Sequence, residues 1–361
     1  MNKPMMIALG TLLLAAPALA QDNVVNVYNW SDYIAEDTVA KFEAETGIKV
    51  NYDVYDSNEV LEAKLLAGSS GYDIVVPTGS FLERQIAAGL LQPIDKTKLT
   101  NYGNLDPTIL NTAAVHDAEN AHSVPYMSFT VGIGYNVAKV KERLGDVPVD
   151  SWDLIFKPEV ASKLADCGIA LLDSPSEVMG TALHYLGLDA NSESAEDLAK
   201  GEALLLAARP NIRYFHSSQY IDDLGSGEIC VALGYSGDVF IAADAATEAN
   251  AGVEVGYVIP KEGALTAFDL MAIPVDAPHL ENAYKFIDYV LRPEVTAGIT
   301  NYVFYASANA AATQFVDDEV KNNPGIYPPA EIVAKSFGLK SHTPGFDRDL
   351  TRAWTRIKTG Q

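Results

Sequence analysis

The stretch Val24-Val25-Asn26-Val27-Tyr28-Asn29-Trp30-Ser31-Asp32-Tyr33 decides the fold class, because it begins a repeated alternation of strand and helix patterns. Its first five residues form a short apolar run, which is typical of a strand buried inside a parallel sheet. The pattern then predicts a helix over 36–45, a strand over 48–55, a helix from the cap residue Ser57 to Gly68, a strand over 72–77 and a helix over 81–88. This order of elements predicts a parallel, doubly wound sheet.

Aromatic and polar residues follow two of these strands directly. Trp30, Ser31 and Asp32 come after the first strand, and Thr78 and Ser80 come after the third. Ligands of doubly wound sheets bind outside the carboxyl ends of the strands. We therefore expect these two groups of side chains to line one crevice.

The residues after the first strand combine aromatic rings with a carboxylate. Trp30, Asp32 and Tyr33 stand within four positions, and similar clusters recur over 234–238 and 267–269. A carboxylate supplies negative charge, and the faces of aromatic rings attract desolvated ammonium and methylene groups. We therefore expect the three clusters to form one cleft for a small organic cation.

The later part of the chain indicates a second sheet. A crossing segment is expected over 131–136, followed by a helix over 139–144. Strand patterns appear over 168–172 and 228–233, and 254–259 is expected to return as a strand. Two parallel-sheet domains that are connected by more than one crossover predict a hinged clamp.

Residues 1–20 have the features of a secretory signal peptide. Lys3 provides a positive charge, residues 5–15 are apolar, and Ala18-Leu19-Ala20 is a small-residue cleavage site, so the mature chain is expected to begin at Gln21. The apolar run is too short to span a bilayer, which argues against a membrane anchor. Since no later segment has a long uncharged apolar run, the mature protein is expected to be soluble.

The net charge of −23 restricts the kinds of partner. It argues against nucleic acid, because proteins that bind nucleic acid need a basic face. A strongly acidic protein can steer a cation toward its surface, and the same charge can also serve solubility alone. Charge by itself does not decide between these two roles.

The two cysteines, Cys167 and Cys230, belong to a chain that is expected to be exported. An even number of cysteines in an oxidising compartment favours one disulfide over two buried thiols. Both lie in the middle third of the chain, so a bridge would connect parts of one domain. Their spacing is not that of a zinc site.

Several segments of this sequence resemble the periplasmic polyamine-binding proteins of ABC importers, and the putrescine-binding branch most closely. The resemblance covers essentially the whole mature chain. It is carried by Val27-Tyr28-Asn29-Trp30-Ser31-Asp32-Tyr33-Ile34, Val75-Val76-Pro77-Thr78, Pro210-Asn211-Ile212-Arg213-Tyr214-Phe215, Ser217-Ser218-Gln219-Tyr220, Val303-Phe304-Tyr305-Ala306 and Pro324-Gly325-Ile326-Tyr327-Pro328-Pro329.

The resemblance implies an α/β fold of the type II periplasmic-binding-protein class. Each of its two domains is a mostly parallel sheet flanked by helices, and the ligand cleft lies between the domains. Domain 1 is expected to comprise 21–131 plus about 259–305, and domain 2 to comprise 132–258 plus about 306–361. The resemblance further implies a periplasmic monomer that delivers a polyamine to an inner-membrane ABC permease, without a cofactor, a metal or an enzymatic activity.

The family's recognition residues can be carried over by position. They fall on Trp30, Ser31, Asp32, Tyr33, Thr78, Ser80, Glu177, Tyr235, Asp238, Asp269 and Tyr305, and the family's cysteine pair falls on Cys167 and Cys230. In this interpretation Asp238 and Asp269 take one ammonium group of the ligand. Asp32, Ser31 and Glu177 lie near the other one, directly or through water, and the aromatic rings cover the methylene chain.

Two positions depart from the family. Tyr235 stands where the family usually has a tryptophan, which keeps an aromatic face but weakens its attraction for a cation. Ala267 stands where a phenylalanine or tryptophan is usual, so the pocket is expected to be larger there unless Phe268 or a loop fills the space. These departures leave the exact ligand open among putrescine, spermidine, agmatine and similar cations.

Other interpretations remain. Asp32 could cap a helix that starts at Ile34, and Tyr302 with Tyr305 could form a paired-tyrosine ferric site. Bilobed enzymes that act on cationic substrates use a cysteine nucleophile, which here would require a free Cys167 or Cys230 near a base such as His184 or His216. A ligand-loaded signalling protein would use the same closed form as a transport protein.

Overall fold

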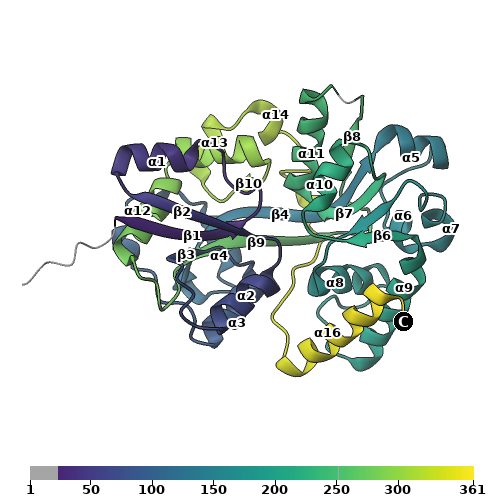
Figure 1. Cartoon of the computed structure of the whole chain (residues 1–361), viewed down its shortest axis with the longest axis horizontal. Helices are drawn as coiled ribbons and strands as arrows, with labels where there is room; N and C mark the ends of the chain where they lie inside the picture. The colour runs from purple at the N-terminus through teal and green to yellow at the C-terminus, as the bar shows by residue number, and fades with distance from the viewer. Residues whose placement is uncertain (1–22, 251) are drawn as a thin grey trace, which may run out of the picture.

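The computed structural model describes residues 23–250 and 252–361. The expected signal peptide and its cleavage after Ala20 lie outside these residues. Two lobes stand side by side, and strands that cross the middle of the molecule connect them (Figure 1). In the described ranges, no helix is both long and apolar enough to traverse a bilayer.

The first lobe is built on the predicted strand–helix alternation. Strand β1 (Val24–Trp30) pairs in parallel with β2 (Lys49–Tyr55) on one side and with β3 (Ile74–Val75) on the other. The intervening helices are α1 (Thr38–Thr46), α2 (Asn58–Leu66) and α3 (Gly79–Ala87). The order of these elements confirms the prediction for this part of the chain.

The helix ends follow local chemistry. The Ser57 hydroxyl accepts a 3.3 Å hydrogen bond from the backbone N–H of Val60, so Ser57 is the predicted cap of α2. Gly47 ends α1 in the left-handed conformation, with φ of 69°, which glycine adopts without steric cost.

Three sequence-based details in this lobe were wrong. Strand β3 has two residues rather than six, and α3 begins at Gly79, so Ser80 lies in the first turn of a helix. Asp32 caps no helix: it lies in a turn with φ of 53°, and α1 begins only at Thr38. Asp32 adopts this left-handed conformation because a short polar side chain tolerates it better than most.

One long strand, β4 (Ser123–Asn136), connects the two lobes. Its first part pairs antiparallel with β9 (Leu265–Ala272), and its last part pairs with β7 (Val231–Tyr235) and β8 (Val255–Val258). The crossing segment expected over 131–136 is therefore the end of a strand that begins eight residues earlier. The strand order along the sheet is β2-β1-β3-β9-β4-β7-β5-β6.

The second lobe contains a parallel group of β5 (Ile169–Leu171), β6 (Ile212–Phe215) and β7. Its main helices are α8 (Pro175–Tyr185), α9 (Ala195–Ala208), α10 (Gln219–Gly225) and α11 (Ser236–Glu248). Cys167 and Cys230 form a disulfide with a Cα–Cα distance of 5.6 Å. It joins the chain just before β5 to the chain just before β7, which confirms the expected bridge.

The C-terminal third returns to both lobes. Helix α12 (Leu280–Val290) packs on β1, and α16 (Pro344–Thr359) packs on α8 and α9 (Figure 1). The domain boundaries expected from the sequence remain a prediction. The remaining elements are α4 (Pro107–Ala113), α5 (Val137–Leu144), α6 (Asp153–Phe156), α7 (Pro158–Ala161), α13 (Pro293–Val303), β10 (Ala306–Ser307), α14 (Asp318–Lys321) and α15 (Ala330–Val333).

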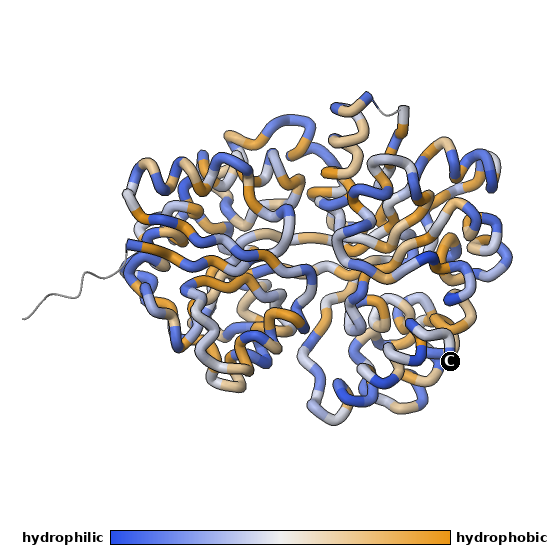
Figure 2. The backbone as a smooth tube through the Cα atoms, viewed as in Figure 1, coloured by the Kyte–Doolittle hydropathy of each residue, from blue (hydrophilic) through white to orange (hydrophobic). Residues whose placement is uncertain are grey.

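The core follows the central strands. Figure 2 shows hydrophobic residues along the strands in the middle of each lobe and hydrophilic residues on the outer helices. Val25, Ile74, Ile133 and Ile169 are almost completely buried on four different strands. Burial of these strands on both faces explains why their sequence patterns are continuous apolar runs.

Candidate ligand-binding site

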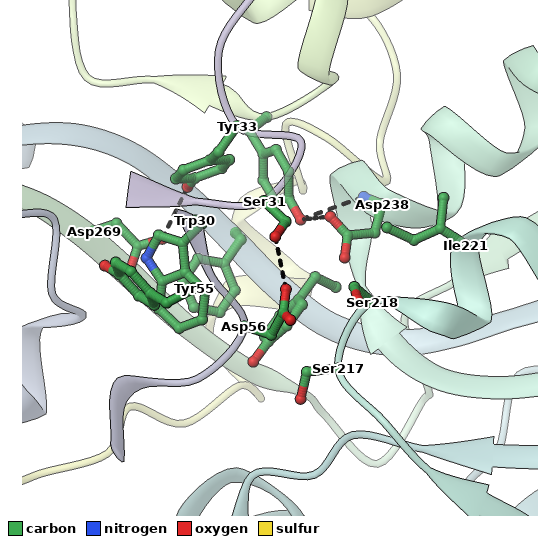
Figure 3. Close-up of a pocket in the computed structure, with 13 residues that line it drawn as sticks. Trp30, Ser31, Tyr33, Tyr55, Asp56, Ser217, Ser218, Ile221, Asp238 and Asp269 are labelled. Atoms are coloured by element: carbon green, nitrogen blue, oxygen red, sulfur yellow. Dashed lines mark hydrogen bonds between the residues drawn. The ribbon is translucent and has the colours of Figure 1, made fainter. Parts of the chain in front are cut away.

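A pocket of about 410 Å³, part of it open to solvent, lies between the two lobes where β1 and β7 end (Figure 3). Residues of both lobes line it: Trp30, Ser31, Tyr33, Tyr55, Asp56, Phe129, Ser217, Ser218, Ile221, Tyr235, Asp238, Asp269 and Tyr305. Seven of the eleven residues that the sequence predicted are among them.

The wall from the first lobe is fixed by a single backbone carbonyl. The Trp30 Nε1–H and the Tyr55 hydroxyl both donate to the carbonyl oxygen of Val76, at 2.9 and 2.6 Å. The two rings lie 4.7 Å apart, centre to centre. Because each ring is held at its polar end, the apolar faces can be presented to a ligand.

Asp269 is a buried carboxyl on β9. Its Oδ2 accepts a 2.9 Å hydrogen bond from the Tyr33 hydroxyl, and its Oδ1 accepts a 2.6 Å bond from the Thr78 hydroxyl. The Asn58 side chain holds Thr78 in place through its backbone N–H and its hydroxyl, each at 3.0 Å. Burial raises the pKa of Asp269 to about 7, although the two hydroxyl donors oppose this shift.

Asp238 is the corresponding carboxyl of the second lobe, in the first turn of α11. Its Oδ2 accepts a 2.6 Å hydrogen bond from the Tyr220 hydroxyl, and its Oδ1 accepts a 2.5 Å bond from the Tyr305 hydroxyl. Burial raises the pKa of Asp238 to about 7. In Figure 3, Asp238 and Asp269 lie on opposite sides of the pocket.

Aromatic rings from both lobes meet between these two carboxyls. The ring centres of Trp30 and Tyr235 lie 6.2 Å apart, and those of Tyr33 and Tyr305 lie 4.7 Å apart at nearly a right angle. Phe129 on β4 supports the edge of Tyr235 at 5.4 Å. Edge-to-face packing of this kind orients the rings as well as burying them.

Glu177 lies behind the pocket rather than in its lining. It is only 4% exposed, and its Oε2 accepts a 2.6 Å hydrogen bond from the hydroxyl of Tyr235. Burial raises the pKa of Glu177 to about 7. Tyr235 therefore connects a carboxyl in the second lobe to the pocket through its own hydroxyl.

A second hollow is bordered by Glu177 and Thr78, whose side chains are hydrogen-bonded to Tyr235 and Asp269 of the pocket. Glu177, Ala267, Thr78 and Ser80 line it, together with His116 from the first lobe. Phe268, the next residue on β9, lines neither hollow. Ala267 and Ser80 thus line this hollow and not the main pocket, so the expected enlargement of the ligand pocket next to Ala267 is not seen.

Asp32 and Ser31 lie toward the mouth. The Ser31 hydroxyl donates a 2.7 Å hydrogen bond to Oδ1 of Asp56 (Figure 3). Asp32 is exposed and borders a surface groove that it shares with Asp222 of α10. Partial burial, then the charges of Asp222 and Asp56, raise the pKa of Asp32 above its usual value.

Six lining residues were not predicted. Tyr55 ends the second strand and Asp56 follows it, so the strand-end argument that selected Trp30 could have found them. Ser217 and Ser218 begin a segment that resembles the family, and they could have been chosen for that reason. Phe129 and Ile221 have no signal of their own, because they are apolar residues within buried elements.

The structure answers two of the alternative interpretations. Tyr302 is 46% exposed, whereas Tyr305 is buried against Asp238, so the two phenols do not converge as paired metal ligands would. Within 23–250 and 252–361, no three His, Cys, Asp or Glu side chains are grouped to hold a metal ion. The sulfurs of Cys167 and Cys230 are bonded to each other, so neither is the free thiol that a cysteine nucleophile would require.

Comparison with known proteins identifies the family. The model of the bacterial extracellular solute-binding proteins matches residues 37–328. The chain belongs to this family. Among the solute-binding proteins, the putrescine-binding periplasmic protein PotF of Escherichia coli (strain K12) is 57% identical over 360 residues, which is 99% of this chain and 95% of that protein. The putrescine-binding periplasmic protein SpuD of Pseudomonas aeruginosa (strain UCBPP-PA14) is 53% identical over 350 residues, 96% of this chain and 95% of that one.

A solved structure of the family agrees with the fold. The spermidine/putrescine ABC transporter substrate-binding protein PotD from Streptococcus pneumoniae strain Canada MDR_19A is 27% identical and superposes with a TM-score of 0.75, over 93% of this chain and 99% of that chain. The fold expected from the sequence, that of type II periplasmic binding proteins, is therefore confirmed. The resemblance to polyamine-binding proteins that was inferred from the sequence is also confirmed, by the two putrescine-binding relatives.

Proposed function

We propose that this solute-binding protein captures a diamine or polyamine, with putrescine as the first candidate, and delivers it to the permease of an ABC transporter. The observation that supports this most directly is the pair of buried carboxyls, Asp238 and Asp269, in an aromatic pocket. Among the residues that the structure describes, none that lines this pocket is basic. When both carboxyls are ionised, no basic side chain in the lining balances them, so a cationic ligand fits this site.

The geometry suits a flexible chain with a cationic group at each end. A buried ammonium group costs several kcal/mol or more unless it is paired and hydrogen-bonded, so each end needs its own acceptors. Asp238 and Asp269 have both oxygens oriented by hydroxyl donors, which leaves further lone pairs for N–H groups. We assign these residues to ammonium binding, Glu177 to an outer role through Tyr235, and Asp32 to the mouth.

The aromatic residues account for the middle of the ligand. Trp30, Tyr33, Tyr235 and Tyr305 present ring faces and edges between the two carboxyls. They would cover methylene groups and exclude water, which strengthens each ammonium–carboxylate contact. Since the pocket draws on both lobes, ligand contacts favour the closed form, which a permease can distinguish from the open one.

Several further features follow from the relatives and belong to the same proposal. Their names place them in the periplasm, so we propose that this chain acts there, after removal of residues 1–20, as a monomer. The relatives are binding proteins, and the bonded cysteines give no free thiol for a nucleophile. We therefore propose that the chain is not an enzyme.

Isothermal titration of ligand-stripped mature protein tests the proposal. Putrescine, cadaverine, agmatine, spermidine and spermine are titrated separately, with ornithine as a control that adds a carboxylate to a diamine. Binding of one or two cations at micromolar Kd or below, without ornithine binding, supports the proposal. Absence of heat with all five cations contradicts it, and mass spectrometry of the molecule that co-purifies with untreated protein then identifies the ligand class.

A further inference from the structure

The C-terminal helix α16 is tied firmly to the second lobe. The Trp354 Nε1–H donates a 2.8 Å hydrogen bond to Asp173, which follows β5. Lys358 pairs with the same carboxylate at 2.9 Å. Just before the helix, the backbone N–H of Thr343 donates a 2.7 Å bond to Glu193. The helix therefore moves with the second lobe when the lobes open or close.

The beginning of α16 also reaches the first lobe. Nη1 of Arg84, on α3, lies 2.8 Å from Oδ2 of Asp347, on the first turn of α16. The adjacent Glu83 accepts a 3.1 Å hydrogen bond from the backbone N–H of Ser341. Both contacts join elements that belong to different lobes, so they exist only while the lobes are together.

The chemistry of Arg84 makes this contact reversible. Its guanidinium also pairs with Glu62, on α2 of the same lobe, with a 2.8 Å bond from Nε to Oε1. It lies over the ring of Phe81 at 4.4 Å from the ring centre. When the lobes separate, Arg84 keeps Glu62 and Phe81 as partners, and Asp347 becomes exposed to water. Opening therefore leaves no buried charge without a partner, which would otherwise be strongly unfavourable.

The Arg84–Asp347 ion pair is partly shielded from water, so it can contribute to the stability of the closed form. The side chains of Arg84 and Asp347 are 21% and 27% exposed, so water screens their attraction less than that of an ordinary surface pair. Oδ1 of Asp347 lies 3.6 Å from Nδ1 of His342, which adds no competing negative charge. An interaction made in only one of two conformations shifts the equilibrium toward that conformation.

Neither residue lines the ligand pocket. Arg84 and Asp347 border a separate groove that is lined by residues of α2, α3 and α16. We propose that the Arg84–Asp347 pair is a latch that stabilises the closed form, and that these two positioning residues set ligand affinity without touching the ligand. The inference rests on the two-lobed clamp of the proposed function, but it does not depend on which cation binds.

Three variants test the latch. Asp347→Asn removes the interlobe charge and leaves the Arg84–Glu62 pair intact, whereas Asp347→Glu retains the charge. Arg356→Gln is the matched control, because Arg356 is on the same helix and pairs at 2.8 Å with Glu202 of α9, inside the second lobe. Spin labels at Val54→Cys and Leu186→Cys, two exposed positions on different lobes, report the distance between the lobes without ligand.

The latch predicts that Asp347→Asn shifts the ligand-free distance distribution toward the open form. It also predicts that this variant binds its ligand about three- to tenfold more weakly through a faster dissociation rate. Asp347→Glu should restore both readouts, and Arg356→Gln should alter neither. An unchanged distance distribution and affinity in Asp347→Asn would overturn the inference, as would equal weakening by Arg356→Gln, which would indicate general loosening of α16. Because the distance measurement needs no ligand, it separates failure of the latch from failure of the polyamine assignment.

Discussion

The hydroxyl of Tyr305 donates a 2.5 Å hydrogen bond to Oδ1 of Asp238, and this bond joins the two lobes inside the pocket. Tyr305 follows α13 and enters β10, which pairs with the first part of β4, whereas Asp238 belongs to α11 of the second lobe. Burial raises the pKa of Tyr305 well above its usual value, so the phenol remains a donor at all physiological pH values. The carboxyl of Asp238 is thus oriented by Tyr305 whenever the two lobes are together.

Removing either buried carboxylate should weaken binding strongly. Asp238→Asn and Asp269→Asn are nearly isosteric, and each should cost about 2–5 kcal/mol of binding because an ammonium group loses its charged partner. Asp56→Asn is the control, since Asp56 also lines the pocket but is only partly buried. It should cost less than about 1 kcal/mol, as exposed charge pairs do. Titration calorimetry measures all three, and a loss below tenfold for both buried positions would contradict the site.

A side chain at Gly237 should disturb the orientation of Asp238. A Cβ atom there would lie 2.2 Å from Cε2 of Tyr305, closer than atoms can approach. Gly237→Ala should therefore displace the Tyr305 ring, lower the free energy of unfolding by about 1–3 kcal/mol and weaken ligand binding at least about tenfold. Gly298→Ala is the control, because Gly298 lies in α13 with no atom within 4 Å of the added Cβ. Relief of its backbone entropy should stabilise the fold by about 0.5–1 kcal/mol, without any effect on binding. Equal behaviour of the two variants in denaturant unfolding and titration would count against this role of Gly237.

Binding should tighten as the pH rises through neutrality. Burial raises the pKa of Asp238, Asp269 and Glu177 to about 7, whereas these groups titrate near about 4 in an unfolded chain. Each carboxyl therefore stabilises the ligand-free fold fully below about pH 4, and this stabilisation is lost as the pH rises through about 7. A cation favours the ionised carboxylates, so binding near neutral pH should release protons and should weaken toward about pH 5.5.

Calorimetry in two buffers of different ionisation enthalpy measures the protons released. Alkylammonium groups keep their charge over this pH range, so the ligand itself contributes no change. Asp269→Asn should reduce the proton release, and Asp32→Asn, at the exposed mouth, should change it less. An affinity that is constant between about pH 5.5 and about pH 8 would show that the carboxyls are already ionised before binding.

Filling the second hollow should alter the preference among ligands. Ala267→Phe places a ring in the hollow that Glu177 and Ser80 also line, next to the residues that are hydrogen-bonded to Tyr235 and Asp269. We expect weaker binding of the longer cations, spermidine and agmatine, by about tenfold relative to putrescine, since one or two methylene-sized groups carry about 1–3 kcal/mol of discrimination. Phe268→Leu serves as the control on the same strand, and it should leave the ranking unchanged. A ranking that is identical in wild type and Ala267→Phe would show that ligands do not reach this hollow.

The disulfide should stabilise the fold without affecting the pocket. Cys167 and Cys230 are 63 positions apart, and closing a loop of this length contributes about 4 kcal/mol in the chain-entropy account, at the upper end of the usual range of about 2–4 kcal/mol. The double variant Cys167→Ala with Cys230→Ala should lose stability of this order in urea unfolding and should bind its ligand within about twofold of wild type. Thiol titration of native wild-type protein should detect no reactive thiol. A stoichiometric thiol would instead revive the interpretation as a cysteine enzyme.

Local signals explain which parts of the fold could be predicted. The opening alternation was predicted well because each apolar run is bounded by a cap or a glycine, as at Ser57 and Gly47. The first part of β4 was missed because Pro125 and interspersed serine and threonine residues break its apolar run and leave no regular alternation. Strand β3 is short because its pairing ends at the single residue Val75 opposite Ala272, a constraint that is absent from the local sequence.

The candidate site likewise contains residues that the sequence could locate and residues that it could not. Residues at strand ends, such as Trp30, could be located by topology, and family resemblance supplied most of the others. The partners that orient the carboxyls could not be predicted, because they are distant in sequence: Thr78 and Asp269 are 191 positions apart, and Tyr305 and Asp238 are 67 apart. Hydrogen bonds of this kind depend on how the two lobes meet, which no local pattern encodes.

The position of Trp30 gives the protein an optical reporter of its own. The chain has three tryptophans, and only Trp30 lines the pocket, with its indole N–H bonded to Val76 and its ring beside Tyr235 of the opposite lobe. Trp152 and Trp354 are buried in the second lobe and bonded to Gly263 and Asp173. Separation of the lobes hydrates one indole and leaves two unchanged, so the emission maximum of the unlabelled protein should move to the red on opening and return on ligand capture. Stopped-flow fluorescence can therefore follow the clamp in real time without an added dye.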